Sequence, residues 1–419
     1  MELEQIKENI YQIPKQGEMN KPARVYANDT LLEEIKQDDT LNQIKNVATL
    51  PGLEKFSIVM PDGHQGYGFP IGGVAAVNKE EGVISPGGIG YDINCGVRVL
   101  KTDLTYEEIR GKEQQLANIL YNKVPCGLGK GGYIDIDENQ LEEILERGME
   151  WMLENGHAKK EDLEHCEENG RLICDPEKVP EDAKKRGIKQ VGSLGSGNHF
   201  LEVQSVENVF NDEKAEAYGL EEGQILVMIH SGSRGLGHQT CTEYLREFEK
   251  NYPEIVEKLP EKELIYAPLG DKLAEDYKNA MFAAANYAWA NRQGITEAVR
   301  ESLDTLFGET QTDLVYDVCH NIAKEETHKV DGEEKELLVH RKGATRAMPA
   351  GREEVPDAYS EAGQPVLIPG SMGTSSYILS GGQNSLELSF GSTAHGAGRL
   401  KSRTQSKKDY RAADRKSVV

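Results

Sequence analysis

The chain has 419 residues, 37% of them hydrophobic, with a formal net charge of -23 and a pI of about 5.0. This length allows one large domain or two smaller ones, each with a buried core. The acidic net charge argues against a protein that coats nucleic acid non-specifically, although a basic strip from Arg399 onward could bind phosphate. With no signal peptide, membrane-length apolar stretch or disulfide spacing, we expect a cytoplasmic protein.

The apolar pattern predicts strands and helices in mixed order. From residue 56 to 100, glycine punctuation and β-branched runs predict strands joined by tight turns. The acidic, polar segment 156–189 is expected to be a surface insertion. Glycine-rich loops far apart in the chain can converge only within one folded unit, so we expect a single α+β domain over residues 1–419. Helices are predicted over 105–122, 138–155, 239–250 and 271–307, and further strands over 225–230, 336–340 and both ends of 365–379.

Cys95 lies in the glycine-rich segment SPGGIGYDINCGVR, three residues after Asp92. A thiolate, a carboxylate and imidazoles form a suitable ligand set for a borderline divalent cation, and a sulfur can bridge two such ions. The alternative for a lone cysteine is a small core hydrophobe. Glycine loops rarely form the centre of a core, which favours the ligand interpretation.

Four histidines stand in glycine-rich or polar settings and are candidates for the same site: His199, His230, His320 and His395. Glu202, three residues after His199, could orient that imidazole or bind a base edge, or it could be a solvated residue. Arg234 follows His230 in a Ser-Gly-Ser-Arg-Gly loop and is a candidate phosphate ligand. His320 alone reads as a core histidine. His395, between glycine-rich neighbours, could be a covalent nucleophile or another metal ligand.

Two further loops, RKGATRA (341–347) and IPGSMGTSSY (368–377), combine cations, small hydroxyls and free backbone N–H groups. Such loops bind phosphates or a nucleobase. Neither matches the P-loop or the dinucleotide-binding fingerprint.

The chain resembles the RtcB family of RNA-splicing ligases in eight motifs that follow in order between about residues 56 and 403. They are PDGHQGYGFPIGG, GYDINCGVR, GSGNHFLEV, HSGSRGLGHQ, YDVCHNIAK, RKGATRA, PGSMGTSSY and FGSTAHGAGR. The resemblance implies an α+β fold in which glycine-rich loops converge on a dinuclear manganese centre. It also implies GTP-dependent joining of RNA 3′-phosphate or 2′,3′-cyclic phosphate ends to 5′-hydroxyl ends, in tRNA splicing or RNA repair.

The resemblance also implies roles for individual residues. Cys95 would bridge two Mn²⁺ ions, with His230 and His320 completing one site and Asp92 and His199 the other. His395 would accept the guanylyl group of GTP. The nucleotide would be held by Asn198, Glu202, Ser371, Met372, Gly373, Thr374, Gly396, Ala397 and Gly398, and the phosphates of nucleotide or RNA by Arg234, Lys342, Arg399 and Arg403.

Two features depart from the family pattern. Ala394 stands where a cysteine is common, a small change that should leave His395 functional. Family members usually continue for some tens of residues past HGAGR, so the C-terminal end of the domain is expected to be missing here. The expected partners are RNA and, as a candidate, archease, with a monomer as the default. Two alternatives stay open: a metal-dependent phosphodiesterase or phosphatase on RNA ends, and a non-catalytic RNA-binding subunit.

Overall fold

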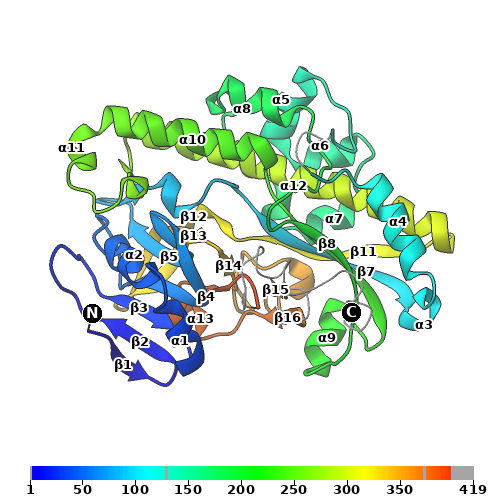
Figure 1. Ribbon diagram of the computed structural model, residues 1–419, viewed down its shortest axis with the longest axis horizontal. Coiled ribbons are helices and arrows are strands. Elements are labelled where there is room, and N and C mark those ends of the chain that lie inside the picture. The colour runs from blue at the N-terminus through cyan, green and yellow to red at the C-terminus, as the bar shows by residue number, and fades with distance from the viewer. Residues whose placement is uncertain (1, 128–130, 371–373, 398–419) are drawn as a thin grey trace.

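The structure is a computed structural model, which describes residues 2–127, 131–370 and 374–397 (Figure 1). It is a mixed α/β fold with two main sheets beside two long helices. Within the described ranges, no helix is both long enough and apolar enough to span a bilayer.

The larger sheet has seven strands, in the spatial order β1-β2-β3-β4-β5-β13-β12. The pairing of β3 with β4 is parallel and the other pairings are antiparallel. Helices α1 (Asp29–Ile35) and α2 (Thr40–Val47) form the connection between these two parallel strands. The strands are β1 (Glu4–Lys7), β2 (Ile10–Ile13), β3 (Ala23–Tyr26), β4 (Ser57–Tyr67), β5 (Phe69–Asn78), β12 (Asn321–Val330) and β13 (Glu333–Lys342).

The smaller sheet has four antiparallel strands, in the order β11-β7-β9-β8. Strand β9 and the first half of β7 are buried on both faces, which is typical of the middle of a sheet covered on both sides. Within the part of the chain that the structure describes, three short pairs lie outside the two sheets: β6 with β10, β14 with β17, and β15 with β16. The bounds are β7 (Gly96–Thr105), β8 (Phe200–Ser205), β9 (Gln224–Ser231), β11 (Thr312–Cys319), β6 (Val83–Ile84), β10 (Ala267–Pro268), β14 (Ala344–Arg346), β17 (Ser392–Ala394), β15 (Pro365–Ile368) and β16 (Tyr377–Ser380).

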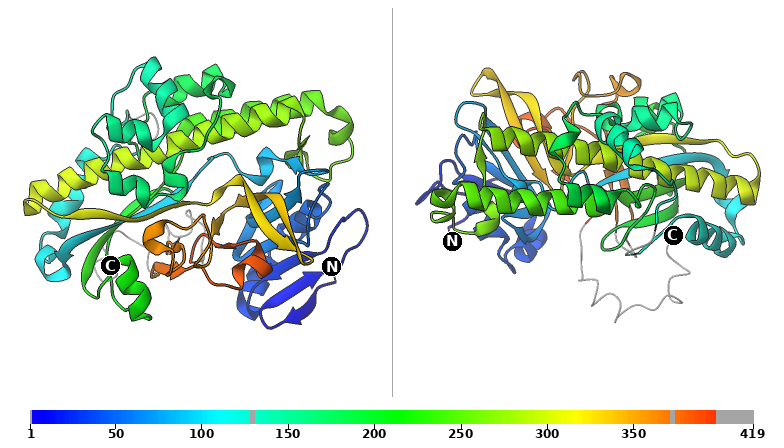
Figure 2. Two further views of the ribbon diagram at one scale, coloured as in Figure 1. Left: turned by 180° about the vertical axis from the view of Figure 1, so that it is seen from behind. Right: turned by 90° about the horizontal axis from the view of Figure 1, so that it is seen from above.

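Two long helices, α10 (Arg234–Asn251) and α12 (Lys272–Phe307), lie side by side along the sheets (Figures 1 and 2). The middle of α12 is alanine-rich and buried on every side, because small side chains let neighbouring elements approach it closely. The other helices are α3 (Tyr106–Ile109), α4 (Glu113–Lys123), α5 (Glu138–Arg147), α6 (Met149–Glu154), α7 (Lys160–Glu164), α8 (Glu181–Gly187), α9 (Asp212–Tyr218), α11 (Pro253–Val256) and α13 (Ser385–Ser389), with 3-10 turns η1 (Pro86–Gly88), η2 (Glu167–Gly170), η3 (Pro176–Lys178), η4 (Lys262–Leu264) and η5 (Asp357–Tyr359).

Most of the predicted elements are confirmed, with changes at their ends. The predicted helix over 138–155 is two helices, because Gly148 adopts φ 51° where its α-carbon lies too close to the carbonyl of Gly170 for a side chain. The helix predicted over 105–122 is likewise divided, between α3 and α4. The N-terminal strands and helices were not predicted, because their runs are only four to eight residues long.

The acidic segment 156–189, expected as a surface insertion, packs against α12 and β11. Its outer residues are charged and exposed, but Asp162, Cys166, Glu167 and Val179 are buried. Its buried carboxylates are paired with cations from distant parts of the chain, so the acidic composition alone did not reveal an inner face.

Candidate metal and nucleotide site

The register of the four-stranded sheet brings the predicted donor residues together. Gly96 pairs with Cys319 on one side and with Ser231 on the other, and Phe200 pairs with His230. The residues next to these pairs are Cys95, His320 and His199, so all four donors stand at the same end of neighbouring strands. Asp92 belongs to the loop that precedes β7.

The side-chain atoms of these residues converge. The Cys95 Sγ lies 3.2 Å from His230 Nε2 and 3.4 Å from His199 Nε2. The two Nε2 atoms of His230 and His320 are 3.3 Å apart, and His199 Nε2 is 2.8 Å from Asp92 Oδ2. The donors form two groups that share the sulfur, and within each group the atoms lie within 4.8 Å of one another: Cys95, His230 and His320, and Asp92, Cys95 and His199.

Buried polar contacts fix the backbone that carries these donors. The Arg292 guanidinium of α12 donates to the carbonyl of Asn94 at 2.8 Å and to that of Ser231 at 3.0 Å. The Asn94 side chain is bonded in turn to the carbonyl of Ala285 on the same helix. The backbone N–H of His320 donates to the carbonyl of Cys95 at 2.8 Å. The long helix therefore holds the residue before Cys95 and the residue after His230.

The electrostatics of the cluster suit a cation. Burial, with the neighbouring imidazoles, lowers the pKa of His230 and His320 well below the usual value, so both rings are neutral and offer a lone pair. Burial opposes ionisation of Asp92, but the contact with His199, together with Arg234 and Cys95, outweighs it and lowers the pKa of Asp92 to about 2. Burial, and then Asp92, raise the pKa of the Cys95 thiol. A thiol, a carboxylate and facing imidazole lone pairs at these distances fit a divalent metal, whose charge would favour the thiolate.

His395 follows β17 and lies beside the cluster, with its ring centroid 4.9 Å from that of His320. Its Nδ1 is 2.6 Å from Oδ2 of Asp62 on β4, a close contact that is not a well-aligned hydrogen bond. The same oxygen accepts the backbone N–H groups of His395 and Gly396 at 3.1 and 3.0 Å. Asp62 thus holds the Nδ1 side of the ring and leaves Nε2 for chemistry. Sequence reasoning missed Asp62, although it stands in the quoted motif PDGHQGYG.

Of the two predicted phosphate ligands within the described ranges, Arg234 contacts the cluster, whereas the Lys342 ammonium contacts backbone carbonyls outside it. The Arg234 guanidinium is 2.9 Å from His199 Nδ1, and Gly195 leaves the space that this guanidinium fills. The Lys342 ammonium is buried and donates to the carbonyl oxygens of Tyr67 and Gly87. Burial lowers the pKa of Lys342 to about 8.

The residues predicted to hold the nucleotide are less completely described. Glu202 on β8 is half-buried, and burial raises its pKa. Its carboxylate accepts a hydrogen bond from the Gln204 amide, which also donates to Ser376 Oγ at 3.0 Å. Ser376 follows the exposed residues Thr374 and Ser375. Asn198 is exposed in the loop before β8, and the Ala397 N–H donates to the carbonyl of Pro369. The predicted residues Ser371, Met372, Gly373, Gly398, Arg399 and Arg403 lie outside the described ranges.

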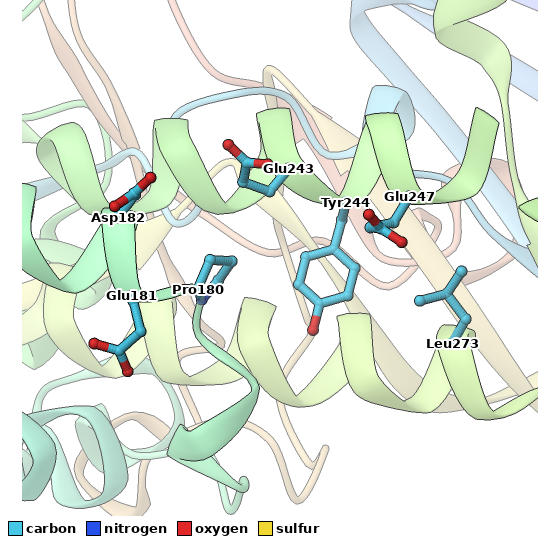
Figure 3. Close-up of a pocket in the computed structure, with 7 residues that line it drawn as sticks. All are labelled: Pro180, Glu181, Asp182, Glu243, Tyr244, Glu247 and Leu273. Atoms are coloured by element: carbon cyan, nitrogen blue, oxygen red, sulfur yellow. The ribbon is translucent and has the colours of Figure 1, made fainter. Parts of the chain in front are cut away.

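A surface cavity of about 440 Å³ lies away from these donors, between α8, α10 and α12 (Figure 3). Carboxylates surround it, and none of the residues that line it belongs to the cluster. A smaller cavity of about 270 Å³ lies next to β17 and is lined by Met60, Pro61 and Thr393, among others. Neither cavity offers the convergent sulfur, carboxylate and imidazole donors of the cluster.

A mixed α/β fold with such a donor set beside a carboxylate-held histidine defines a candidate metal-dependent site for nucleotide chemistry. The model of the tRNA-splicing ligase RtcB family matches residues 43–418. A protein of Thermococcus kodakarensis named tRNA-splicing ligase RtcB is 54% identical over 415 residues, which cover 98% of this chain and 86% of that protein. Proteins of the same name from Aeropyrum pernix and Pyrobaculum aerophilum are each 53% identical, over 95% and 91% of this chain and 85% and 80% of their own lengths. The chain belongs to the RtcB family, as its motifs indicated.

Proposed function

We propose that this chain is an RNA ligase of tRNA splicing or RNA repair, which uses GTP and a guanylylated His395. It joins RNA 3′-phosphate or 2′,3′-cyclic phosphate ends to 5′-hydroxyl ends. Family membership supports the ligase class. The observation that supports the chemistry is the position of His395. Its Nδ1 is 2.6 Å from Asp62 Oδ2, and its ring centroid is 4.9 Å from that of His320.

The residues that would hold two Mn²⁺ ions are those of the two donor groups. His230 and His320 would hold one ion and Asp92 and His199 the other, with Cys95 common to both donor groups. When bound, the ions neutralise phosphate charge and help to align the reacting groups. Manganese is proposed from the resemblance to the family and not from the donor set, because a site with thiolate and imidazole ligands binds several other divalent metals more tightly.

The chain's own residues account for the guanylyl transfer. Asp62 keeps the proton of His395 on Nδ1, so that the Nε2 lone pair attacks the α-phosphorus of GTP. An N–P bond forms, the bond to the β-phosphate oxygen breaks, and pyrophosphate leaves. An oxygen of the RNA 3′-phosphate then displaces His395 from the guanylyl phosphorus. The 5′-hydroxyl finally attacks the 3′-phosphate and GMP leaves, a far better leaving group than the oxygen of a bare phosphate.

The remaining predicted residues would bind the reactants. Glu202 would accept hydrogen bonds from the guanine edge, with Asn198 and Thr374 nearby in the nucleotide site. Arg234, beside His199, would contact a phosphate of the RNA or of the nucleotide, as would Lys342. Archease as a partner, the monomeric state and a cytoplasmic location stay predictions.

The first test is covalent labelling. With [α-³²P]GTP and Mn²⁺, the protein should acquire an acid-labile label, because a phosphoramidate bond to an imidazole is hydrolysed in acid. His395→Ala should acquire none, and Cys95→Ala should be strongly impaired. Equal labelling of His395→Ala and the unaltered protein would refute the proposed nucleophile.

A ligation assay on RNA halves with 3′-phosphate and 5′-hydroxyl ends, with GTP and Mn²⁺, tests the whole reaction. The ligase predicts a joined product that is lost in His395→Ala. A phosphodiesterase would open cyclic ends without GTP and would keep that activity in His395→Ala. An RNA-binding subunit would bind the halves in a salt-sensitive way without turnover.

A further inference from the structure

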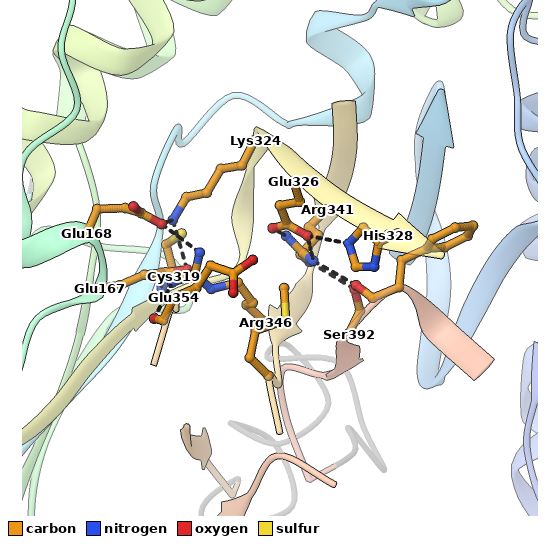
Figure 4. A network of polar contacts seen from close by, with 12 residues as sticks. Glu167, Glu168, Cys319, Lys324, Glu326, His328, Arg341, Arg346, Glu354 and Ser392 are labelled. Carbon is orange, nitrogen blue, oxygen red and sulfur yellow. Dashed lines mark hydrogen bonds and ion pairs between the residues drawn. The ribbon is translucent and has the colours of Figure 1, made fainter. Parts of the chain in front are cut away.

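Two carboxylates, the buried Glu167 and the partly exposed Glu168, form an ionic cluster that the proposed reaction does not use (Figure 4). They come from η2, in the acidic segment between α7 and α8. Glu168, Asn169 and Gly170 follow one another with φ of 55°, 52° and 72°. Consecutive non-glycine residues in the left-handed region are unfavourable, so the surrounding contacts must hold this turn in place.

The ionic cluster contains two anions, Glu167 and Glu168, and two cations, Lys324 and Arg346. Lys324 Nζ lies 2.9 Å from Glu167 Oε1 and 3.0 Å from Glu168 Oε1. Arg346 Nε lies 3.1 Å from Glu167 Oε1, and the same guanidinium reaches Glu168 Oε1 at 2.6 Å. The side chains of Glu167, Lys324 and Arg346 are at most 4% exposed, and that of Glu168 is 30% exposed. The charges balance, as buried ionic groups require.

Glu167 has one contact that Glu168 lacks. Its second oxygen, Oε2, accepts the backbone N–H of Cys319 at 2.8 Å. Cys319 immediately precedes the predicted metal ligand His320. Glu167 therefore binds the last residue of β11, next to His320 of the donor cluster.

Through Arg346, the same carboxylate also reaches the strand that carries the predicted nucleophile. Arg346 ends β14 and pairs with Ser392 of β17, and Ala344 pairs with Ala394, next to His395. The Ala344 N–H donates in turn to the carbonyl of His320 at 3.2 Å. The short β14 thus touches both the ligand and the nucleophile strand, and Glu167 holds its far end.

A second buried pair holds β17 from the other side (Figure 4). Arg341 is paired with Glu326 through two oxygens and donates to Ser392 Oγ and to the carbonyl of Phe390, both at 2.9 Å. Because β17 is fixed on this side, a shift of β14 would change the separation of the two imidazoles rather than move them together.

We propose that Glu167 is a positioning residue that sets the geometry between the metal ligand His320 and the nucleophile His395. The proposal rests on the proposed function, since it assigns those roles. It does not require Glu167 to touch metal, nucleotide or RNA.

Two variants that remove the same charge from the same cluster test this. Glu167→Gln cannot satisfy both the Cys319 N–H and the two cations, because one end of an amide is a donor. Glu168→Gln loses a charge but leaves the contact with Cys319 intact. At saturating GTP and Mn²⁺, we expect Glu167→Gln to guanylylate about 10- to 100-fold more slowly, the range typical of partners that orient metal ligands. Glu168→Gln should be guanylylated at a rate close to that of the unaltered protein. Its urea midpoint should nevertheless fall by about as much as that of Glu167→Gln.

The second readout uses Co²⁺ alone, without GTP or RNA. Its absorption bands report the ligand geometry at Cys95 and His320, and we expect them to shift in Glu167→Gln but not in Glu168→Gln. Unchanged bands, with rate losses that merely follow the urea midpoint in both variants, would overturn the proposal. If the unaltered protein is not guanylylated at all, the proposed function fails, while the Co²⁺ comparison still decides the positioning role.

If Glu167→Gln does not fold, the double variant Glu167→Gln/Lys324→Met restores the charge balance. We expect it to recover the urea midpoint but to keep the slow guanylylation and the shifted Co²⁺ bands. Recovery of the rate and the bands together with stability would show that only the charge balance mattered, and would refute positioning by Glu167.

Discussion

Asp62 and His395 are 333 residues apart in the chain, yet one carboxylate oxygen meets the ring and two backbone N–H groups of the histidine loop. The Asp62 side chain is 6% exposed and that of His395 is 17% exposed. A histidine can act as a nucleophile only with a free nitrogen, and the partner of the other nitrogen decides which one that is. Here the partner is Asp62.

Asp62→Asn should therefore slow guanylylation without removing the proposed nucleophile, His395. The amide keeps a similar shape but loses the charge that stabilises the Nδ1–H form of His395. We expect a loss of about 100-fold in the rate of labelling by [α-³²P]GTP, by analogy with other carboxylate–histidine pairs. Binding of Co²⁺ should stay normal, because Asp62 belongs to neither donor group. An unchanged labelling rate would show that the contact does not orient the ring.

The long helix α12 supports the cluster through a buried ionic group rather than through apolar packing alone. Asp317 on β11 accepts from Arg292 of α12 and from Arg98 of β7 at 2.7 to 2.8 Å, and all three side chains are fully buried. Because Arg292 also binds the carbonyls beside Cys95 and His230, this group links the helix to the strands that carry the donors.

Asp317→Asn should destabilise the protein strongly, because it leaves two buried guanidinium groups without a counter-charge. We expect a loss of about 3 to 5 kcal/mol in the free energy of unfolding, measured by urea denaturation. Asp313→Asn on the same strand is the matched control, because its partner Lys159 is 3.3 Å away and both side chains are partly exposed. The control should lose less than about 1 kcal/mol. Similar losses in both variants would contradict the role of burial.

The molecule as a whole carries a net charge of -23 and yet buries several carboxylates. These carboxylates have pKa values below the usual range, because their paired cations outweigh the opposing effect of burial. They include Asp162, Glu167, Asp317 and Glu326, and the partly exposed Glu168 has a lowered pKa for the same reason. The remaining acidic charge favours solubility. The paired carboxylates, in contrast, connect the two sheets and the segment 156–189.

Stability should fall steeply in acid. A carboxylate whose pKa is lower in the folded state stabilises the protein above its unfolded pKa, and this contribution is lost as the pH falls towards the folded pKa. For Glu168, whose pKa is about 2, the loss between pH 6 and pH 3 is about 1 to 2 kcal/mol after allowance for its partial exposure. Urea denaturation across this range should show a shallower decline in Glu168→Gln than in the unaltered protein. Parallel declines would contradict the assignment.

Sequence patterns were most informative where structure is local. The helix over 272–307 could be predicted because its periodicity extends over many residues, and the strands over 225–230 and 336–340 because each contains a continuous apolar run. The break at Gly148 and the inner face of the segment 156–189 could not, because each depends on a contact with a distant residue. Gly148 meets Gly170, and Glu167 meets Lys324 and Arg346.

By itself, the sequence determined the family, through eight ordered motifs, and named the side chains whose chemistry suits a metal and a nucleotide. It also placed Asp92, Cys95 and the histidines at loops that follow or precede strands. Only the tertiary structure decided that Asp62 holds His395 and that Glu167 binds the backbone beside His320. The reason is physical: periodicity and motif spacing report contacts within one element, whereas these pairs depend on strand register and on buried charges that meet only after the whole chain has folded.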